Sequence, residues 1–178
     1  MKFEKLELEG AFIIMPEKLN DERGYFTRSW DKEIFEKNKI NSSILQCNIS
    51  YNKKKGTVRG LHYQTKPFEE AKLVRCTNGK VFEILLDLRR DSKTYLKWIG
   101  IEIDSKDLKM IFVPEGFALG FQTLEDDTTL FYQMSQIYKP EFARGVRYDD
   151  PILNIKWPIE VTNISEKDKD WKFLKNNS

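Results

Sequence analysis

The sequence predicts an all-β protein, an antiparallel sandwich or barrel, formed as a single domain by residues 1–178. Short segments rich in Val, Ile, Phe, Tyr and Thr follow one another and are separated by turns of Gly, Pro, Asn, Asp and Lys, which is the pattern of antiparallel strands. Only two segments have helical character, so strands do not alternate with helices and a parallel sheet is not expected. A chain of 178 residues fits one domain with a substantial hydrophobic core.

The expected elements are placed in chain order. Strands are expected at residues 11–15, 43–50, 57–64, 71–77, 80–89, 96–103, 110–113, 118–124 and 128–136. Helices are expected at 31–38 and 166–174. Asn78-Gly79 lies between two of the strands, and because both residue types accept a positive φ, this pair predicts a hairpin turn.

The segment 80–89 predicts a ligand cavity inside the barrel. Successive side chains of a strand point to opposite faces, so one face of this segment is uniformly apolar from Phe82 to Leu88. The opposite face carries Glu83 and Asp87 among apolar residues, where a simple sandwich would have either solvent or core. A face that is polar and partly enclosed favours a barrel that holds a ligand.

Composition limits the partners. The chain has 30 Lys and Arg against 28 Asp and Glu, interspersed, so the balance of +2 predicts no nucleic-acid binding but permits a small anionic ligand. The charged start MKFEKLELEG does not resemble a signal peptide, and no apolar run approaches the roughly 20 residues of a membrane span. Cys47 and Cys76 form no disulfide or metal pattern and are expected to be reduced packing residues. We therefore expect a cytoplasmic protein with no membrane partner.

His62 is the only histidine in the chain, which restricts the chemistry. Metal-dependent cupins and zinc hydrolases normally need several imidazoles, so a catalytic metal held by a histidine cluster is excluded. The sequence has no GxSxG, P-loop or GxGxxG motif. A lone histidine is more often structural, but His62 lies ten residues before Lys72, in a segment expected to run alongside that of Lys72.

Removal of a proton next to a ketone is one reaction that these residue types could perform. It requires a base that titrates near neutrality, a cation or donor for the developing enolate oxygen, and an acid that returns the proton. Histidine, lysine and tyrosine meet these needs. At this level Lys72 could equally be a solvated strand lysine, and Tyr132 a core aromatic residue with a satisfied hydroxyl.

Several motifs, in order, resemble those of the dTDP-4-dehydrorhamnose 3,5-epimerase family. They are DERGYF at 21–26, GTVRGLHYQ, AKLVRCTNGKVFEILLDLR, FVPEGFALGF, LFYQMS, RGVRYDDPILNIKWP and ISEKDKDW, and they cover nearly all of the chain. The resemblance implies a jelly-roll (cupin-like) barrel with a few short helices, no catalytic metal and no cofactor. It also implies a homodimer that acts on dTDP-4-keto-6-deoxyglucose on the route to dTDP-L-rhamnose, and hence in polysaccharide biosynthesis.

The resemblance implies roles for individual residues. His62 of the RGLH motif is the expected base, and Asp168 the carboxylate that orients it. Lys72 is expected to stabilise the enolate, and Tyr132 to act from the opposite face of the sugar. The residues expected to bind the nucleotide and the sugar are Arg23, Phe26, Gln46, Asn48, Arg59 and Tyr138.

Elementary chemistry agrees with several of these roles. Two arginines suit a diphosphate because their planar forks supply paired donors. The Tyr138 ring can stack on a base, although a loop-packing aromatic is an equally good interpretation. Arg59 and His62 are three apart, so strict alternation would send them to opposite faces, but Gly60 would permit a bulge that brings both into one cavity.

The chain departs from the family pattern at four positions. Leu119 stands where GFAHGF has histidine, and Glu83 where aspartate is usual, so both are counted with the substrate-binding residues. Arg28 stands where the DERGFFxE motif is acidic, and Cys47 where QDN has aspartate. We expect deprotonation to be retained, and we expect the departures around the ligand to affect the nucleotide, the sugar and the carbon that is inverted.

Three functions remain open from the sequence. The first is a 3,5-epimerase, and the second is a C3-only or C5-only epimerase on a dTDP-, CDP- or GDP-linked 4-keto sugar. The third is a nucleotide-sugar binding protein that has lost catalysis. Retention of His62, Lys72, Tyr132 and Asp168 argues against the third, because binding alone needs no base and acid pair, while Leu119 keeps it open.

Overall fold

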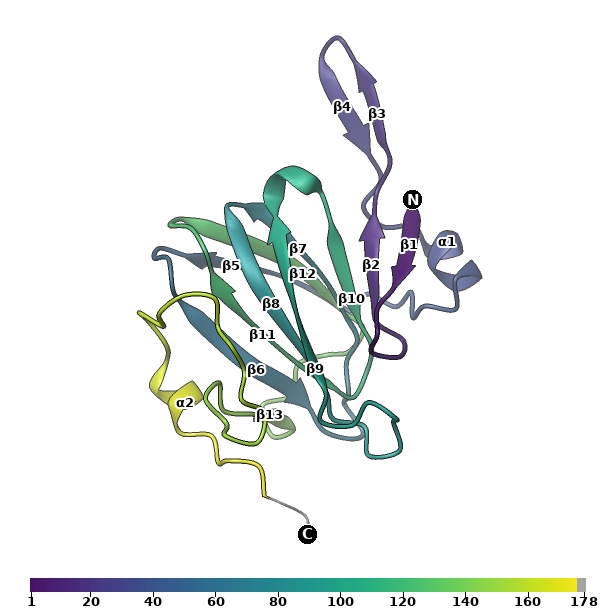
Figure 1. Ribbon diagram of the computed structural model, residues 1–178. Coiled ribbons are helices and arrows are strands. Elements are labelled where there is room, and N and C mark those ends of the chain that lie inside the picture. The colour runs from purple at the N-terminus through teal and green to yellow at the C-terminus, as the bar shows by residue number, and fades with distance from the viewer. Residues whose placement is uncertain (176–178) are drawn as a thin grey trace.

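The computed structural model describes residues 1–175, and the last three residues of the expected domain lie outside the described residues. Two antiparallel sheets pack face to face (Figure 1). One contains, from edge to edge, β1 (Lys2–Lys5), β2 (Phe12–Met15), β10 (Met110–Val113), β7 (Lys72–Asn78), β12 (Thr128–Met134) and β5 (Gln46–Asn52). The other contains β13 (Ala143–Gly145), β6 (Val58–Gln64), β11 (Phe117–Thr123), β8 (Lys80–Asp87) and β9 (Trp98–Asp104). The fold is the all-β antiparallel jelly-roll (cupin-like) barrel that the sequence predicts.

A two-stranded hairpin, β3 (Lys18–Asp21) and β4 (Gly24–Thr27), extends away from the two sheets (Figure 1). Each of the nine predicted strands corresponds to one of the observed strands, with ends that differ by a few residues. The strands that the sequence did not reveal are β1, β3, β4 and β13. They are three or four residues long. β1, β3 and β13 consist mainly of charged, polar or small residues and so lack the β-branched and aromatic content that marks the other strands, whereas β4, with the sequence GYFT, has that content and was missed.

The hairpin predicted at Asn78-Gly79 is wrong. The chain does turn there, and Gly79 has a φ of +77°. However, β7 pairs with β10 and β12, whereas β8 pairs with β11 and β9, so the turn carries the chain from one sheet to the other. The turn chemistry predicts the reversal of direction but not the partners, which are set by the sheet that each strand joins.

The core lies between the two sheets. Its central cluster includes Val74 and Ile111 from one sheet and Val81 and Leu85 from the other. A second cluster, around Phe35, covers the outer face of the six-stranded sheet, and a third, around Leu86, covers the outer face of the five-stranded sheet. The clusters leave part of the space between the sheets to a cavity.

The alternation predicted for 80–89 is observed in β8, with one exception. Ile84 and Leu86 belong to the outer apolar cluster, while Val81 and Leu85 belong to the central one, as expected. Glu83 lines the cavity, but Asp87 does not. Asp87 instead accepts hydrogen bonds from Arg89, Ser92 and Thr94 at the end of the strand, so only one of the two carboxylates is available to a ligand.

The helices are shorter than predicted. α1 spans Lys32–Lys37 and is capped by Asp31, whose side chain accepts a hydrogen bond from the Ile34 N–H. α2 spans only Glu166–Lys169, and a single 3₁₀ turn, η1, spans Ser105–Asp107. The prediction of a helix to residue 174 is wrong because Trp171 leaves the helix to pack against Gly145.

Cys76 is buried, as expected, but the expectation that Cys47 packs in the interior is wrong, because it is exposed on the outer face of β5. No helix among residues 1–175 is both long and apolar enough to cross a membrane.

Candidate active site

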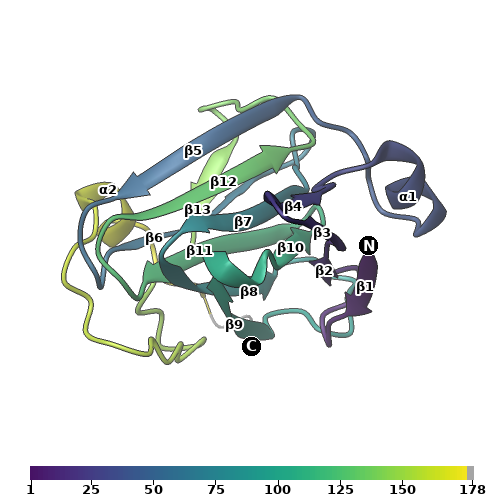
Figure 2. The same cartoon turned by 90° about the horizontal axis from the view of Figure 1, so that it is seen from above.

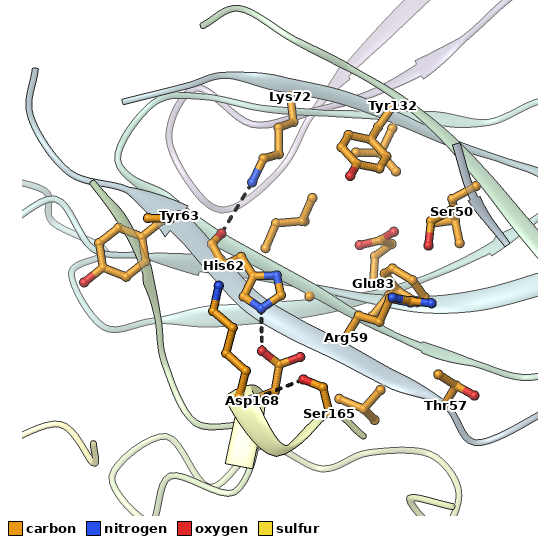
Figure 3. A pocket seen from close by; sticks show the side chains of 18 of the residues that line it. Ser50, Thr57, Arg59, His62, Tyr63, Lys72, Glu83, Tyr132, Ser165 and Asp168 are labelled. Atoms are coloured by element: carbon orange, nitrogen blue, oxygen red, sulfur yellow. Dashed lines mark hydrogen bonds and ion pairs between the residues drawn. The ribbon is translucent and has the colours of Figure 1, made fainter. Parts of the chain in front are cut away.

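A cavity of about 730 Å³ lies between the two sheets, beside α2. Strands of both sheets contribute to its lining, and the segment 163–171 covers one side (Figure 3). Seen from above, α2 lies near one end of β6, far from α1 (Figure 2). Of the residues that the sequence singled out, those in the lining are His62, Lys72, Tyr132, Asp168, Arg59, Tyr138, Leu119 and Glu83.

His62 and Asp168 form a hydrogen-bonded pair at the side of the cavity near α2. The distance from His62 Nε2 to Asp168 Oδ1 is 2.5 Å. Asp168 is almost fully buried, whereas the His62 side chain is 44% exposed and borders the cavity. Because Asp168 occupies Nε2, Nδ1 is the ring nitrogen left to exchange a proton with a ligand.

The short helix α2 positions Asp168. Ser165 caps this helix, and its hydroxyl accepts a hydrogen bond of 3.1 Å from the Asp168 N–H. Burial raises the pKa of Asp168, but the hydrogen bond to His62 and the backbone N–H of Gly60 outweigh it and hold the pKa below its usual range. Asp168 therefore stays ionised near neutral pH and favours a protonated His62 after proton transfer.

A bulge in β6 brings Arg59 and His62 to the same cavity. His62 pairs with Leu119 and Arg59 with Phe121, so three steps along β6 match two along β11. Gly60 has a φ of +111°, and a Cβ there would lie 2.6 Å from the Gly120 Cα. Only glycine fits this position, and the bulge that the sequence analysis expected at Gly60 is confirmed.

Lys72 reaches the cavity from the opposite sheet. The prediction that its segment runs alongside β6 is wrong, because β6 and β7 belong to different sheets. The Lys72 Nζ instead approaches His62 across the barrel and donates to its backbone carbonyl at 3.4 Å. It also pairs with Glu70 at 2.9 Å, so the ammonium group is held in place at the cavity wall.

Tyr132 also faces the cavity from the six-stranded sheet, across from His62 (Figure 3). Burial raises the pKa of its phenol, with the charge of Glu83 adding to this effect and that of Arg59 opposing it. The phenol therefore remains protonated at neutral pH and can donate a proton or a hydrogen bond.

Arg59 and Tyr138 lie at the part of the cavity bordered by β5. Arg59 Nε donates to Asn52 Oδ1 at 2.7 Å, which fixes the guanidinium plane. Tyr138 is 46% exposed, and its backbone N–H donates to Gln46 Oε1 at 2.6 Å. Gln46 and Asn48 on β5 are not part of the lining, but each is hydrogen-bonded to a residue that is: Gln46 accepts from the Tyr138 N–H, and Asn48 donates to the Met134 sulfur.

Arg23 and Phe26 lie apart from the cavity, on the projecting hairpin. Phe26 is 64% exposed, and Arg23 pairs only with its neighbour Asp21 among the described residues. Arg28 pairs with Asp31 at the start of α1. Of the four departures from the family pattern, Leu119 and Glu83 line the cavity, whereas Arg28 and Cys47 do not.

Several lining residues were not identified from the sequence. They include Tyr63, Glu70, Arg144, Lys167 and Trp171. Trp171 Nε1 donates to Asp168 Oδ1 at 3.3 Å, so it contacts the oriented carboxylate directly. Its place in ISEKDKDW, three residues after Asp168, was a usable signal, while Arg144 lies on a strand too short to be recognised.

The arrangement supports proton transfer to and from carbon. A carboxylate-oriented imidazole stands on one side of the cavity, and a protonated phenol and an ammonium group on the other. A ketone oxygen near Lys72 would be polarised, which acidifies the adjacent C–H group. Within residues 1–175 no group of three or more His, Cys, Asp or Glu side chains is arranged to hold a metal ion.

Comparison with known proteins gives consistent results. Residues 5–176 match the family model of dTDP-4-dehydrorhamnose 3,5-epimerase. The chain is 41% identical to the protein of that name from Methanothermobacter thermautotrophicus, over 99% of this chain and 96% of that protein. It is 35% identical to the dTDP-4-dehydrorhamnose 3-epimerase of Streptomyces niveus, over 98% of this chain and 84% of that protein. The crystal structure of the Bacillus anthracis 3,5-epimerase with TDP and PPi bound is similar at a TM-score of 0.94 and 34% identity, covering 97% of this chain and 99% of that one.

Proposed function

The chain belongs to the dTDP-4-dehydrorhamnose 3,5-epimerase family, and from this premise we propose how its residues act. The protein is an isomerase, a nucleotide-sugar epimerase that inverts C3, C5 or both in a nucleoside-diphosphate 4-keto-6-deoxy sugar. It acts by deprotonation next to the ketone and reprotonation from the opposite face. The observation that carries the assignment of residues is the hydrogen-bonded pair of His62 and Asp168 facing Tyr132 and Lys72 across one cavity.

His62 takes the proton from the carbon next to the ketone through Nδ1. The charge that develops on the ketone oxygen is stabilised by the ammonium group of Lys72. Asp168 stabilises the imidazolium and fixes its orientation. Tyr132 returns a proton to the same carbon from the other side, which inverts the configuration. The proton that His62 gained and the one that Tyr132 lost are exchanged with water before the next turnover.

The nucleotide binds at the part of the cavity bordered by β5. Arg59 offers a guanidinium held by Asn52, which suits a phosphate group. Tyr138 offers an exposed ring that can stack on a base. Gln46 holds its backbone N–H, and Asn48 lies two residues further along β5. The sugar then extends from Arg59 toward His62.

The protein is proposed to be a homodimer in which the hairpin of one protomer reaches the cavity of its partner. Two observations support this. Arg23 and Phe26 match ligand-binding positions of the family but lie on an exposed arm that cannot serve its own cavity without moving. At the border of the cavity, β5 exposes Ile49 to 74% and Tyr51 to 51%, an apolar surface suited to a second copy.

Mixing two inactive variants tests the exchange of the arm. Arg23→Ala and His62→Asn carry their defects in different halves of the proposed composite site. Co-expression should restore activity, because one of the two pockets of a mixed dimer then has both a normal arm and a normal base. Activity that is never restored, or a protein that sediments as a monomer, would contradict the proposal.

Two further features complete the proposal. Residues 1–178 are proposed to form one epimerase domain, which the family match to residues 5–176 supports. The protein is proposed to act in the cytoplasm, since Cys47 and Cys76 are free thiols, as is usual in a reducing compartment.

The decisive experiment is incubation with dTDP-4-keto-6-deoxyglucose in deuterated water. Deuterium at both C3 and C5 is the expected result, and none at either carbon would overturn the proposal. Deuterium at C3 alone would favour the second candidate, a C3-only epimerase. That candidate is supported by the Streptomyces niveus relative, which is named a 3-epimerase, and by Leu119 in the cavity.

A further inference from the structure

Glu83 is the least satisfied polar group of the cavity. It lies on β8, its side chain lines the cavity, and the residue is 1% exposed. Both carboxyl oxygens are buried, and neither has a hydrogen-bond partner among residues 1–175. Such a group is costly to the fold unless a bound molecule satisfies it, so its presence at a ligand cavity needs a physical reason.

The lack of a partner follows from the neighbouring strand. Glu83 pairs with Phe121 in the register of β8 and β11, and Leu85 pairs with Leu119. Glu83 and Leu119 are therefore diagonal neighbours on the same inner face. The family motif has histidine at position 119, which could hydrogen-bond an acidic residue at position 83. Leu119 offers no donor, so the carboxyl group of this chain stands alone.

The charged groups around Glu83 are engaged elsewhere. Lys72 of β7 pairs with Glu70 at 2.9 Å, Arg59 of β6 donates to Asn52 at 2.7 Å, and His62 of β6 binds Asp168. The remaining titratable groups that face Glu83 are Tyr132 of β12 and Cys76 of β7. Neither is a cation, so no neighbouring group in the described part of the chain both neutralises and hydrogen-bonds the carboxylate.

Burial therefore decides the protonation state. It raises the pKa of Glu83 to about 8, and the charge of Lys72 opposes this only in part. At neutral pH most molecules carry a carboxylic acid at this position, with one O–H donor and one carbonyl acceptor. A sugar hydroxyl offers the complementary acceptor and donor in one atom.

We propose that the Glu83 carboxylic acid binds a hydroxyl group of the sugar, donating through its O–H and accepting through its carbonyl oxygen, and so orients the ring where Leu119 contributes no polar atom. This assignment rests on the proposed function, since it takes the ligand to be a nucleotide-linked sugar. It makes Glu83 a determinant of specificity for a hydroxylated sugar ring.

Three variants at one position test it. Glu83→Gln keeps the shape, one donor and one acceptor, and should retain kcat/KM within about fivefold of the wild type, because only the choice of donor atom changes. Glu83→Leu removes both and should lower kcat/KM by about tenfold to a hundredfold. Glu83→Leu should bind dTDP alone as tightly as the wild type does, because the proposed contact is to the sugar and Arg59 keeps its hydrogen bond to Asn52. Glu83→Asp shortens the side chain by one methylene group, and its kcat/KM should lie between those of Glu83→Gln and Glu83→Leu.

The pH dependence provides a second readout. In the wild type, kcat/KM should fall above about pH 8 as Glu83 ionises, and the Glu83→Gln variant should lose that part of the decline. Infrared spectra at neutral pH should contain a carboxylic-acid C=O band that Glu83→Gln lacks. Leu119→His should move the decline to lower pH, because a new imidazole can pair with the ionised carboxylate.

Each outcome is decisive. Glu83→Leu with wild-type kcat/KM would show that Glu83 does not touch the sugar. A Glu83→Gln variant as inactive as Glu83→Leu, or the absence of the infrared band, would show that the carboxylate form acts instead. Failure of the proposed function is recognised separately, because the wild-type protein would then incorporate no deuterium whatever the behaviour of the Glu83 variants.

Discussion

β8 carries two buried carboxyl groups in opposite circumstances, Asp87 at its end and Glu83 in its middle. At one end Asp87 is fully buried and accepts hydrogen bonds from Arg89 Nε at 2.9 Å, Arg89 Nη2 at 2.8 Å, Ser92 Oγ at 2.6 Å and Thr94 Oγ1 at 2.7 Å. Burial raises its pKa, but these donors outweigh burial and hold the pKa at about 2. Four residues earlier, Glu83 is equally buried, has no partner among the described residues, and has a pKa raised to about 8.

The comparison shows that burial alone does not give a carboxyl group its role. Both carboxylate oxygens of Asp87 accept hydrogen bonds from the loop 89–94, so Asp87 stabilises the structure at the end of the barrel. Glu83 has its hydrogen-bonding capacity free and faces the cavity, so it is available to a ligand. Asp168 combines both properties, since it is satisfied by protein donors and one of those donors is the catalytic histidine.

The largest effect is expected at the cavity, from His62→Asn. Asparagine fills similar space but cannot accept the proton, so the rate of solvent exchange into the substrate should fall by roughly a hundredfold to ten-thousandfold. The free energy of unfolding should change little, because the His62 side chain is half exposed. Exchange is measured by mass spectrometry in deuterated water. A wild-type exchange rate would remove His62 from the mechanism.

The second largest effect is expected on stability, from Asp87→Ala. Asp87→Ala leaves Arg89 without its carboxylate and strands the hydroxyls of Ser92 and Thr94, so the free energy of unfolding should fall by about 2–4 kcal/mol. Urea denaturation measures the loss. The exchange rate per folded molecule should stay at the wild-type value. A drop in that rate with full stability would contradict the structural role assigned to Asp87.

The pH dependence of stability should separate the two carboxyls by sign. Glu83 is neutral in the folded state and ionised in the unfolded state between its ordinary pKa of 4.5 and about 8, so its contribution is greatest below that window and is lost as pH rises through it. The slope approaches about 1.4 kcal/mol per pH unit. Asp87 acts oppositely, contributing above its ordinary pKa of 3.8 and losing its contribution as pH falls toward 2.

Glu83→Gln isolates the Glu83 contribution. Urea denaturation at several pH values gives the free energy of unfolding of the wild type and of the variant. The wild-type value minus the variant value should fall as pH rises from about 5 to 8. Equal slopes for the two proteins would mean that Glu83 is ionised in the folded state. Glu83→Met should also raise the free energy of unfolding by about 1 kcal/mol, since it removes an unsatisfied buried group at the expense of function.

Much of the barrel could be predicted from the sequence because its strands are long, apolar and regularly interrupted. Strand pairing could not, as the turn at Asn78-Gly79 shows, because a turn motif carries no information on which sheet each strand will join. The same limit applied to Lys72, which approaches His62 across the barrel rather than from a neighbouring strand. Local signals specify elements, while the approach of the two sheets depends on packing over the whole core.

The proposed catalytic residues that meet in the cavity were named from motifs, and the bulge at Gly60 followed from parity and one glycine. What the motifs could not reveal was which buried carboxyl groups have hydrogen-bond partners within the protein. The unequal satisfaction of Glu83 and Asp87 depends on side chains from the loop 89–94 and from β11, which alternation along one strand does not report. Arg23 and Phe26 show a further limit, since their motif is continuous in sequence but their positions are remote from the cavity in one protomer.

The smallest effect is expected from Trp171, which has both a packing contact and a contact with the catalytic pair. Its Nε1 donates to Asp168 Oδ1 at 3.3 Å, the same oxygen that binds His62, and its ring packs closely against Gly145. Trp171→Phe keeps most of the packing and removes the donor. Asp168 retains its hydrogen bonds to His62 and to the Gly60 N–H, so kcat should fall by only about twofold to fivefold. Because the indole acts on the orientation of the base, kcat should fall while KM stays constant. A change in KM with unchanged kcat would instead show that Trp171, which lines the cavity, acts by contacting the sugar rather than by positioning Asp168.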